Sequence, residues 1–331
     1  MAIILDAMGS DKYPDPEIEG AVRASQLIQE DIILVGDENI LSEKLNEKTN
    51  NLTKIHIVHA PEVVDMWDKP VESAKKKPNN SMAVGINLVK ESDNNAFVTA
   101  GNTGGAMFNG LRVLGRIKGV QRPALTAAIP TRKGHCIVAD IGANADCRPE
   151  FLLQFALMGS IYSQKVLCLT NPTVAILSNG EEEGKGNQLV KDAFNLLKNS
   201  SLNFIGNVEP KELFAGNADV VITDGFTGNV LIKSSEAVAQ MITDVLKEEL
   251  LKSLITKIGA ALAKPAFAKM KSLIDPSEIG AAPLLGLDGL VFVGHGRSDA
   301  KAITSAILLA NQAISSGYMS AIKKEIKKSL G

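Results

Sequence analysis

Residues 173–190 read TVAILSNGEEEGKGNQLV, which joins a β-branched apolar run, a loop rich in glycine and glutamate, and an amphipathic continuation. The apolar run predicts a buried strand, and the spacing after the loop predicts a helix. A strand that leads through a glycine-rich loop into a helix is the repeating unit of α/β folds. The loop also poses a chemical question. Glycines and Lys185 after a strand favour phosphate, whereas the glutamates of residues 181–183 repel it.

The same unit recurs along the whole chain. Short apolar runs that end in polar or turn-forming residues lie at residues 2–6, 31–36, 54–60, 96–102, 135–144, 173–180, 203–207, 219–225 and 289–296. Helical patterns lie at residues 16–29, 81–90, 149–163, 187–198 and 299–313. Runs that are apolar throughout are typical of strands buried on both faces of a mostly parallel sheet. We therefore expect one layered, doubly wound α/β domain that spans residues 1–331.

One stretch departs from this alternation. Residues 250–274, LLKSLITKIGAALAKPAFAKMKSLI, contain five lysines, no acid and many aliphatic side chains. The pattern predicts two amphipathic helices broken at Pro265. We expect a helical excursion from the α/β domain over residues 244–275.

The composition excludes several classes of protein. A net charge of −2 and an aromatic content of 4% do not suit an extended nucleic-acid surface, so no nucleic-acid partner is expected. Cys136, Cys147 and Cys168 are scattered without a CxxC spacing, as in a reduced cytosolic protein. The first residues lack the pattern of a signal peptide, and no run approaches the roughly 20 apolar residues that span a bilayer. We expect a cytoplasmic protein that at most sits on a membrane surface.

Polar, glycine-containing segments follow several of the predicted strands. They are DAMGSD (6–11), GNTGG (101–105), GANADCRPE (142–150), NGEEEGKGN (179–187), FTGN (226–229) and GHGRSD (294–299). Glycine lets backbone amides approach an anion closely, and a following helix favours negative charge at its N-terminus. Ligands of open α/β sheets bind beyond the carboxyl ends of the strands. The sequence therefore predicts a shared pocket of the phosphate-binding type.

Familiar nucleotide motifs do not fit these loops. GEEEGKG has one residue too few between its first two glycines for a P-loop, and Gly186 replaces the serine or threonine that would hold magnesium. GKGNQL and GHGRSD begin as GxGxxG but lack the last glycine. Binding of ATP or NAD is therefore not expected from motifs.

Lys185 is the strongest candidate for chemistry. Its positive charge lies between glycines at the start of a predicted helix, where it opposes the helix dipole. An anionic ligand, or negative charge that develops during a reaction, explains this position better than solvation alone. His295 follows a strand and is a candidate acid–base group.

Other reactive residues receive structural interpretations. Cys147 has no histidine close to it in the sequence, so we interpret it as a small buried residue and not as a nucleophile. His135 opens a strand and is interpreted as structural. Asp140, Asp146 and Asp224 lack a paired ligand motif, so no metal site is expected.

The loops, in this order, resemble the bacterial phosphate acyltransferase family. The likeness is carried by DAMGSD (6–11), NNSM (79–82), AGNTGG (100–105), LGRIKGVQRPAL (114–125), DIGANADCRPE (140–150), QFALMGS (154–160), NGEEEGKGN (179–187), FIGNVE (204–209), DGFTGNV (224–230) and GHGRSDA (294–300). Ser10, Gly105 and Arg297 depart from the family pattern, in which glycine, alanine and serine are expected.

The resemblance implies an enzyme that makes acyl phosphate from fatty acyl-acyl-carrier-protein and inorganic phosphate at the start of phospholipid synthesis. It implies a Rossmann-like αβα sandwich related to isocitrate and isopropylmalate dehydrogenases, with the excursion as a protruding amphipathic hairpin. It further implies a homodimer that associates peripherally with the membrane and passes its product to a membrane glycerol-3-phosphate acyltransferase. No cofactor is expected, because the thioester already carries the energy.

The resemblance also assigns residues to roles. Lys185 matches the lysine thought to act in the family's active site, and Asn229 lies in a loop thought to help form it. His295, proposed above from its place after a strand, completes the predicted catalytic set. Phosphate or substrate is expected to contact Asp6, Gly9, Gly101, Asn102, Thr103, Gly104, Gly142, Asn144, Asn179, Gly184, Gly186, Asp224, Gly228 and Ser298. The expected donors are the backbone amides of residues 101–105 and 142–144 and the side chains of Asn102, Asn144 and Asn229. The glutamates of residues 181–183 are expected to orient Lys185.

The sequence leaves alternatives open. The lysine-rich excursion is expected to contact a dimer partner, an anionic membrane surface or the acidic carrier protein, and these uses need not exclude one another. Two other functions fit less well: a nicotinamide-dependent decarboxylating dehydrogenase on the same fold, and a non-catalytic membrane-surface scaffold for lipid synthesis.

Overall fold

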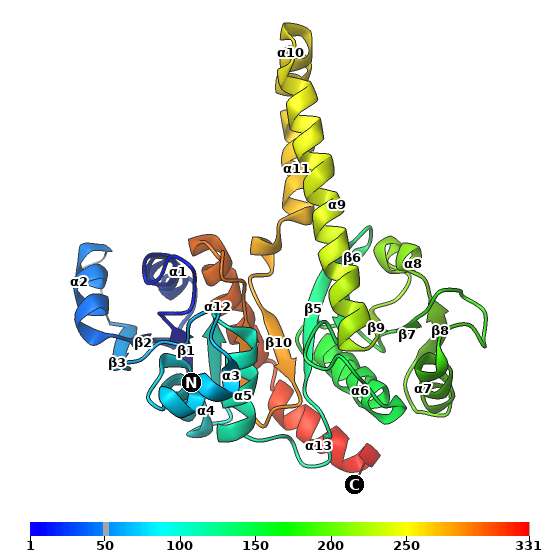
Figure 1. Ribbon diagram of the computed structural model, residues 1–331, viewed down its shortest axis with the longest axis horizontal. Coiled ribbons are helices and arrows are strands. Elements are labelled where there is room, and N and C mark those ends of the chain that lie inside the picture. The colour runs from blue at the N-terminus through cyan, green and yellow to red at the C-terminus, as the bar shows by residue number, and fades with distance from the viewer. Residues whose placement is uncertain (49–52, 331) are drawn as a thin grey trace.

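The strands of the chain form one large sheet with helices on both faces. A computed structural model describes residues 1–48 and 53–330, and its strand order is β3-β2-β1-β4-β11-β10-β5-β6-β9-β7-β8 (Figure 1). The strands are β1 (Ala2–Asp6), β2 (Asp31–Gly36), β3 (Ile55–His59), β4 (Asn95–Thr99), β5 (Ala124–Thr131), β6 (Gly134–Ala139), β7 (Val174–Leu177), β8 (Phe204–Val208), β9 (Val220–Ile222), β10 (Ala282–Leu285) and β11 (Leu290–Val293). The predicted α/β class is confirmed.

The helices follow most strands, as the sequence pattern predicts. They are α1 (Asp15–Ser25), α2 (Glu38–Lys48), α3 (Pro70–Lys76), α4 (Ser81–Lys90), α5 (Thr103–Val113), α6 (Pro149–Lys165), α7 (Gln188–Lys198), α8 (Pro210–Ala215), α9 (Gly225–Leu251), α10 (Leu254–Leu262), α11 (Lys264–Ile274), α12 (Ala300–Ser315) and α13 (Tyr318–Leu330), with a short 3-10 turn at Pro276–Glu278. All five helical segments predicted from periodicity are present, with bounds that differ by a few residues.

The sheet contains two parallel groups that run in opposite directions. β3, β2, β1, β4 and β11 are parallel to one another, and so are β6, β9, β7 and β8. β10 and β5 join the groups through antiparallel pairings on both sides. Because the strand direction reverses at three successive pairings, the second group is antiparallel to the first. The strands that precede the polar loops therefore do not end at one common edge of the sheet.

β5 and β10 are the strands that the sequence pattern did not predict. β5 reads ALTAAIPT and β10 reads APLL, and alanine and proline give both a weak β signal. Pro130 and Pro283 lie inside these strands and cannot donate to the ladder. Because these two strands carry the reversals, missing them left only the prediction of a mostly parallel sheet.

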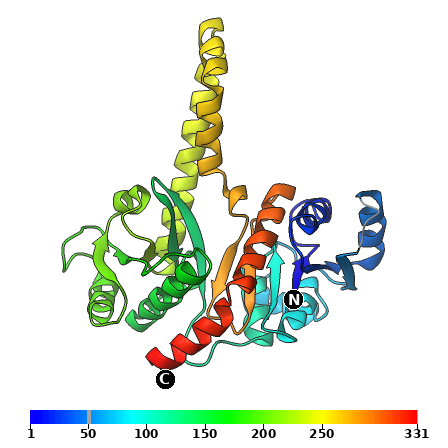
Figure 2. The same ribbon diagram turned by 180° about the vertical axis from the view of Figure 1, so that it is seen from behind.

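The core lies on both faces of the sheet, since successive strand residues point to opposite sides. Ile3 belongs to the largest cluster, beneath α1, α6, α12 and α13, and Ile4 belongs to a second cluster beneath α4 and α5. In β6, Ile137 joins the largest cluster, and Val138 joins a third cluster under α8. Figures 1 and 2 show these helix layers from opposite sides.

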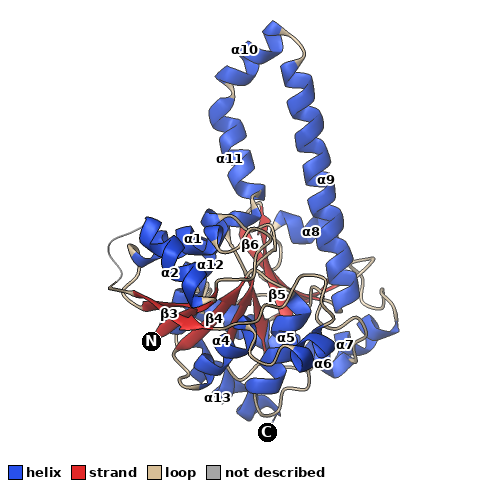
Figure 3. Ribbon diagram, turned by 60° about the vertical axis from the view of Figure 1, so that its left-hand side comes forward, coloured by secondary structure: helices blue, strands red, loops and turns tan. Residues whose placement is uncertain are grey.

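Three helices extend away from the sheet. α9, α10 and α11 (residues 225–274, here called the projection) rise from it as two antiparallel arms joined at a tip (Figures 1 and 3). α9 has 27 residues and begins at Gly225, so the segment FTGN (226–229), expected to be a loop, forms the first turn of a helix. Pro265 lies in the first turn of α11, where proline is tolerated. No described helix is long and apolar enough to cross a membrane.

Candidate functional site

A chain of hydrogen bonds organises the loops after β1 and β4. Asp6 is fully buried at the end of β1, and its carboxylate accepts a hydrogen bond from the Thr99 hydroxyl at 2.7 Å. Thr99 Oγ1 accepts one from the Gly101 amide at 3.0 Å. Gly9 packs against this chain, because a Cβ there would lie 2.9 Å from the Gly101 nitrogen. Burial raises the pKa of Asp6. The Asp6 side chain supports the two loops from inside and does not reach solvent.

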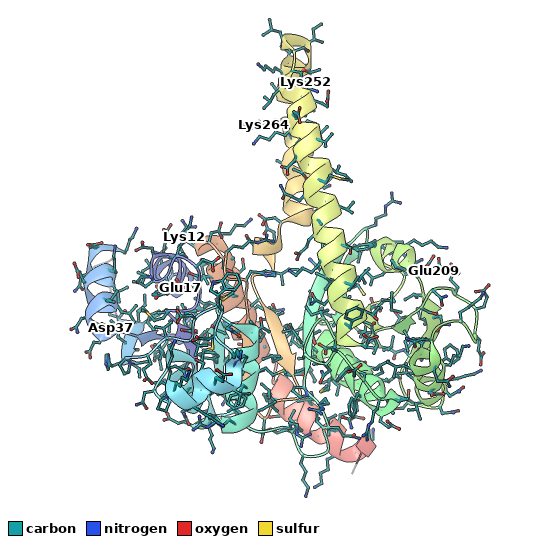
Figure 4. The ribbon with its side chains drawn as sticks, viewed as in Figure 1. Lys12, Glu17, Asp37, Glu209, Lys252 and Lys264 are labelled. Atoms are coloured by element: carbon teal, nitrogen blue, oxygen red, sulfur yellow. The ribbon has the colours of Figure 1, made fainter. Side chains whose placement is uncertain are left out.

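Glu17 of α1 is a second buried carboxyl group behind these loops (Figure 4). Its Oε1 accepts a hydrogen bond from the Ser10 amide at 2.9 Å, whereas its Oε2 has no partner among the described residues. Desolvation, reinforced by the charge of Asp6, raises the pKa of Glu17 to about 7. The sequence pattern alone did not single out this residue. The available signal was its helical spacing from buried Ala21 and Ala24, which places it on the core-facing side of α1.

The GNTGG loop begins α5 and anchors a neighbouring segment. Asn102 caps α5, with its Oδ1 accepting a hydrogen bond from the Gly105 amide at 2.9 Å. The Asn102 side-chain amide donates to the carbonyls of Asp65 at 3.3 Å, Met66 at 3.1 Å and Asp68 at 3.0 Å. Met66 also packs against Gly296, where a Cβ would lie 2.8 Å from Met66 Cε. Residues 65–68 therefore bridge the loops after β4 and β11. Thr103 is exposed at the start of α5, and Gly104 is half-buried.

The loop after β11 presents His295 to solvent. Ser298 is buried, and its amide donates to the His295 carbonyl at 2.9 Å. Desolvation and the positive charges of Lys233 and Arg297 lower the pKa of His295, and Glu236 opposes them. A lowered pKa keeps the imidazole neutral near physiological pH, and the neutral form can accept a proton.

Asp140 is the centre of a second group of loops. It is fully buried at the end of β6. Its carboxylate accepts hydrogen bonds from the amides of Leu125 at 2.9 Å, Gly142 at 3.2 Å, Ala143 at 3.1 Å and Asn144 at 2.6 Å, and from Asn144 Nδ2 at 2.8 Å. The expectation that the amides of residues 142–144 and the Asn144 side chain hold phosphate is therefore corrected. They are directed at Asp140, because a buried carboxylate needs donors.

The same group includes the start of α9. Asp224 caps the helix, and its carboxylate accepts hydrogen bonds from the amide and the hydroxyl of Thr227, each at 2.8 Å. The Gly225 amide donates to the Asn144 carbonyl at 2.8 Å. Asp224 thus stabilises the helix N-terminus.

Asn229 lies in the first turn of α9, and not in a loop as expected. α9 can approach the Asp140 loop because residue 228 is glycine: a Cβ there would lie 2.0 Å from the Asp140 carbonyl oxygen. Asn229 is exposed, and its Nδ2 lies 3.9 Å from the position of a Cβ on Gly142. The structure therefore brings Asn229, Gly142 and Gly228 together.

Lys185 lies in the loop between β7 and α7. Asn179 Oδ1 accepts a hydrogen bond from the Gly186 amide at 2.9 Å and closes this loop. Gly184 and Gly186 have φ values of 99° and 96°, which glycine adopts readily. Lys185 is exposed and packs its stem beside Gly180. The loop leaves the same sheet edge as residues 140 and 223, because β6, β9 and β7 pair in parallel register.

Two of the three glutamates of this loop pair with other lysines. Glu183 forms an ion pair with Lys198 at 2.9 Å, and Glu181 forms one with Lys211 at 3.1 Å. The expected salt bridge from these glutamates to Lys185 is wrong, since no ion pair of Lys185 occurs within residues 1–48 and 53–330. Carboxylate oxygens of Glu181, Glu209 and Glu212 lie within 4.8 Å of one another, and Lys211 occupies their centre, at 3.0 to 3.4 Å from each residue.

Cys147 lies in the loop after β6, close to Asn144, but is not an activated thiol. Its Sγ donates to the Asn144 carbonyl at 3.6 Å. Burial, together with the charge of Asp140, raises the pKa of Cys147 to about 12. The thiol therefore stays protonated and is a poor nucleophile.

Helix α9 connects the two groups of loops. Its first turn lies at the Asp140 loop, and Lys233 and Glu236, further along it, lie close enough to His295 to influence the pKa of that imidazole. Ile141 of the second group packs against the same core cluster as Met107 of α5. The loops after β4 and β6 therefore share one face of the sheet, although their strands run in opposite directions. We call the surface along the first turns of α9, between these loops, the α9 site. Among the described residues, no hydrogen bond or ion pair joins Lys185 to Asn229 or His295.

Comparisons with known proteins agree with one another. The family described as fatty acid synthesis protein matches residues 1–321. The chain is 47% identical over 327 residues to a phosphate acyltransferase of Elusimicrobium minutum, covering 98% of this chain and 96% of that protein. It is 49% identical over 308 residues to a phosphate acyltransferase of Clostridioides difficile, covering 93% of this chain and 91% of that protein.

Solved structures share the fold at low identity. A phosphotransacetylase from Streptococcus pyogenes gives a TM-score of 0.61 at 18% identity, over 95% of this chain and 94% of that chain. A 4-hydroxythreonine-4-phosphate dehydrogenase from Burkholderia phymatum gives 0.52 at 13% identity, over 94% of this chain and 97% of that chain. At these identities the likeness concerns the fold alone.

Proposed function

The chain belongs to the fatty acid synthesis protein family and, like its relatives, is a phosphate acyltransferase, and we propose that its acyl donor is fatty acyl-acyl-carrier-protein. The comparisons favour neither the dehydrogenase nor the scaffold alternative. The observation that carries the proposal is the position of α9. Its first turn presents Asn229 beside the Asp140 loop, and the charges of Lys233 and Glu236, further along the helix, act on the pKa of His295.

In the proposed reaction, a phosphate oxygen attacks the carbonyl carbon of the thioester. A tetrahedral intermediate forms, the carbon–sulfur bond breaks, and the carrier leaves as a thiolate that takes up a proton. The products are acyl phosphate and free carrier protein. Negative charge develops on the carbonyl oxygen, so nearby donors lower the barrier. Holding both reactants in one orientation lowers it further.

Three side chains have the chemistry that this reaction needs. The Asn229 amide can donate to phosphate, and the Lys185 ammonium can offset the developing charge. His295, whose pKa is lowered, can take a proton from the attacking phosphate. Because the amides of residues 142–144 are paired with Asp140, we assign phosphate binding to these side chains and to Thr103. No cofactor enters the proposal, since the thioester supplies the energy.

We assign the projection to contacts outside the α9 site. At its tip Leu254 is 78% exposed, Ile255 84%, Ile258 63% and Leu262 80%. Lys252 and Lys264 lie beside them (Figure 4). An apolar surface flanked by lysines suits an anionic membrane. Nearer the sheet, Val238, Met241, Ile242 and Val245 are exposed at helical spacing, which suits packing against a second copy in a homodimer.

From these proposed contacts we infer a place in the cell and a partner. A homodimer held peripherally at the cytoplasmic face of the membrane could pass acyl phosphate to a membrane glycerol-3-phosphate acyltransferase. We also assign the fold to the Rossmann-like αβα group of isocitrate and isopropylmalate dehydrogenases. The likeness to a dehydrogenase structure supports this assignment.

The proposal is tested by incubating the purified chain with fatty acyl-acyl-carrier-protein, with and without inorganic phosphate, and trapping the product with hydroxylamine. We expect hydroxamate only with phosphate, and an equal amount of free carrier thiol. Absence of phosphate-dependent product would reject the acyl donor that we propose.

The same assay tests the role of Lys185. Lys185→Met is expected to lower the rate about tenfold or more, because a charge near the developing oxyanion is lost. Lys198→Met is the matched control: it breaks the ion pair with Glu183 in the same loop and should keep most of the activity. A wild-type rate for Lys185→Met in a normally folded protein would remove Lys185 from the mechanism.

A further inference from the structure

We propose that a surface pocket between α4 and α5 binds a small polyol phosphate that regulates the α9 site. The two helices lie side by side (Figure 3). The cavity has a volume of about 250 Å³ and is lined by Pro78, Ala83, Asn87, Lys90, Asn109, Arg112 and Val113. One water needs only roughly 10–15 Å³, so this pocket, here called the α4–α5 pocket, has room for a small organic molecule.

Asn109 contributes an unpaired acceptor to the pocket. Its side chain is 1% exposed. Its Nδ2 donates to the Gly105 carbonyl at 3.0 Å, but its Oδ1 has no partner among the described residues. Buried oxygens of this kind are normally hydrogen-bonded. A ligand that fits the pocket should therefore present a hydroxyl group to Asn109.

Lys90 and Arg112 contribute positive charge to the pocket. They are exposed in the last turns of α4 and α5, and no acidic residue lines the cavity. Neither has an ion pair within the part of the chain that the structure describes, and Arg112 donates to the Ala74 carbonyl at 3.5 Å. Helix dipoles explain a cation in each last turn. They do not explain why both cations line one cavity that also holds an unpaired acceptor.

The two features together define the ligand. The cations require an anionic group, and Asn109 requires a hydroxyl donor. Inorganic phosphate offers both but is small for a cavity of about 250 Å³. A phosphate monoester of a short polyol offers both and fills more of the space.

The α4–α5 pocket is linked to the α9 site through α5. Asn109 holds the Gly105 carbonyl, and the Gly105 amide is held by Asn102 at 2.9 Å. Asn102 in turn fixes residues 65–68. A ligand on Asn109 would therefore brace the GNTGG loop. This step rests on the proposed function, and we expect the bound ligand to lower the KM for inorganic phosphate.

Calorimetric titration of the full chain with glycerol 3-phosphate, a simple polyol phosphate, tests the binding. We expect saturable binding by the wild type and by Lys185→Met. The double variant Lys90→Gln/Arg112→Gln should bind at least about tenfold more weakly. Lys165→Gln is the matched control, because it removes an exposed cation from the last turn of α6 and should bind like the wild type. Glycerol, which has no charge, should not bind. Inorganic phosphate should compete only weakly.

Equal binding by the double variant and the wild type, or no binding to the wild type at millimolar concentration, overturns the proposal. Binding that Lys185→Met abolishes also overturns it, because the ligand then depends on the loop between β7 and α7 and not on the α4–α5 pocket. An unchanged KM for phosphate with bound ligand overturns the regulatory role. If no variant makes acyl phosphate, the proposed function fails, and the binding result still decides the pocket.

Discussion

The buried carboxyl group of Glu17 gives the folded chain a pH dependence that an exposed one would not. Its pKa is about 7 in the folded chain, against an ordinary value of 4.5. The folded state therefore holds this proton more tightly than the unfolded state. The stabilising contribution is full below the ordinary pKa and is lost as pH rises toward the folded pKa.

Glu17→Gln should remove this part of the pH dependence and keep the acceptor for the Ser10 amide. Between about pH 5 and about pH 8, we expect the unfolding free energy of the wild type to fall by about 2–3 kcal/mol more than that of the variant. Urea unfolding at both pH values measures the difference. Asp6, whose pKa is also raised, titrates in both proteins. Identical pH dependence of the two proteins would show that Glu17 is not the titrating group.

Asp140 is expected to be the residue whose loss most damages the second group of loops. In Asp140→Asn, one carboxylate oxygen becomes an NH₂ donor that faces backbone donors, so at least one buried amide loses its acceptor. We expect the unfolding free energy to fall by about 2–4 kcal/mol. Asp146→Asn, a change at an exposed neighbour, should alter it by less than about 0.5 kcal/mol. Equal effects of the two changes would contradict the central role of Asp140.

At the scale of single residues, the sequence identified which loops matter but not how their atoms pair. Lys185 and the glutamates of residues 181–183 are adjacent in the chain, and adjacency suggested a salt bridge. The fold instead places Lys198 and Lys211, from other elements, at those carboxylates. Such partners depend on tertiary packing, which local spacing does not encode.

At the scale of elements, hydrophobic periodicity was sufficient to predict the strands and helices whose buried residues follow a regular pattern. Strands such as β1 and helices such as α6 carry strong apolar patterns and were predicted. The base of α9 was missed because its glycines resemble a loop. Gly225 and Gly228 are tolerated in the helix because both pack closely on residues 140–144, and Asp224 caps its start. A tertiary contact therefore overrides the low helix propensity of glycine.

The tip of the projection is expected to bind anionic membranes. Leu254→Glu/Ile258→Glu places charge in an apolar surface flanked by lysines, so binding to vesicles with anionic lipid should fall about tenfold or more. Flotation with liposomes measures it. Ser234→Glu/Gln240→Glu adds the same charge at exposed polar positions of α9 and should retain most binding. Equal flotation of the tip variant and the wild type would rule out the tip as the membrane contact.

At the scale of the whole molecule, the sequence predicted that the polar loops after the strands of a mostly parallel sheet would form one shared pocket. The antiparallel strands β10 and β5 separate them into two groups. The loops after β4 and β6 still share one face, because Ile141 and Met107 pack on one core cluster. The relation between the groups depends on strand reversals, and these were the weakest signals in the sequence.

If both groups form one site, a bound substrate should slow amide hydrogen exchange in both at once. We expect inorganic phosphate with a non-hydrolysable acyl carrier thioester analogue to protect residues 101–105 and 142–147 together, and Asn229→Ala to lose both effects. The physical reason is that a ligand bound along α9 restrains the loops that contact this helix and its neighbours. Mass spectrometry of exchanged peptides measures the protection, with β2 as an internal reference remote from the site. Protection of only one group would mean that the reaction takes place within one half of the sheet, and α9 would then be a structural connection and not the centre of the site.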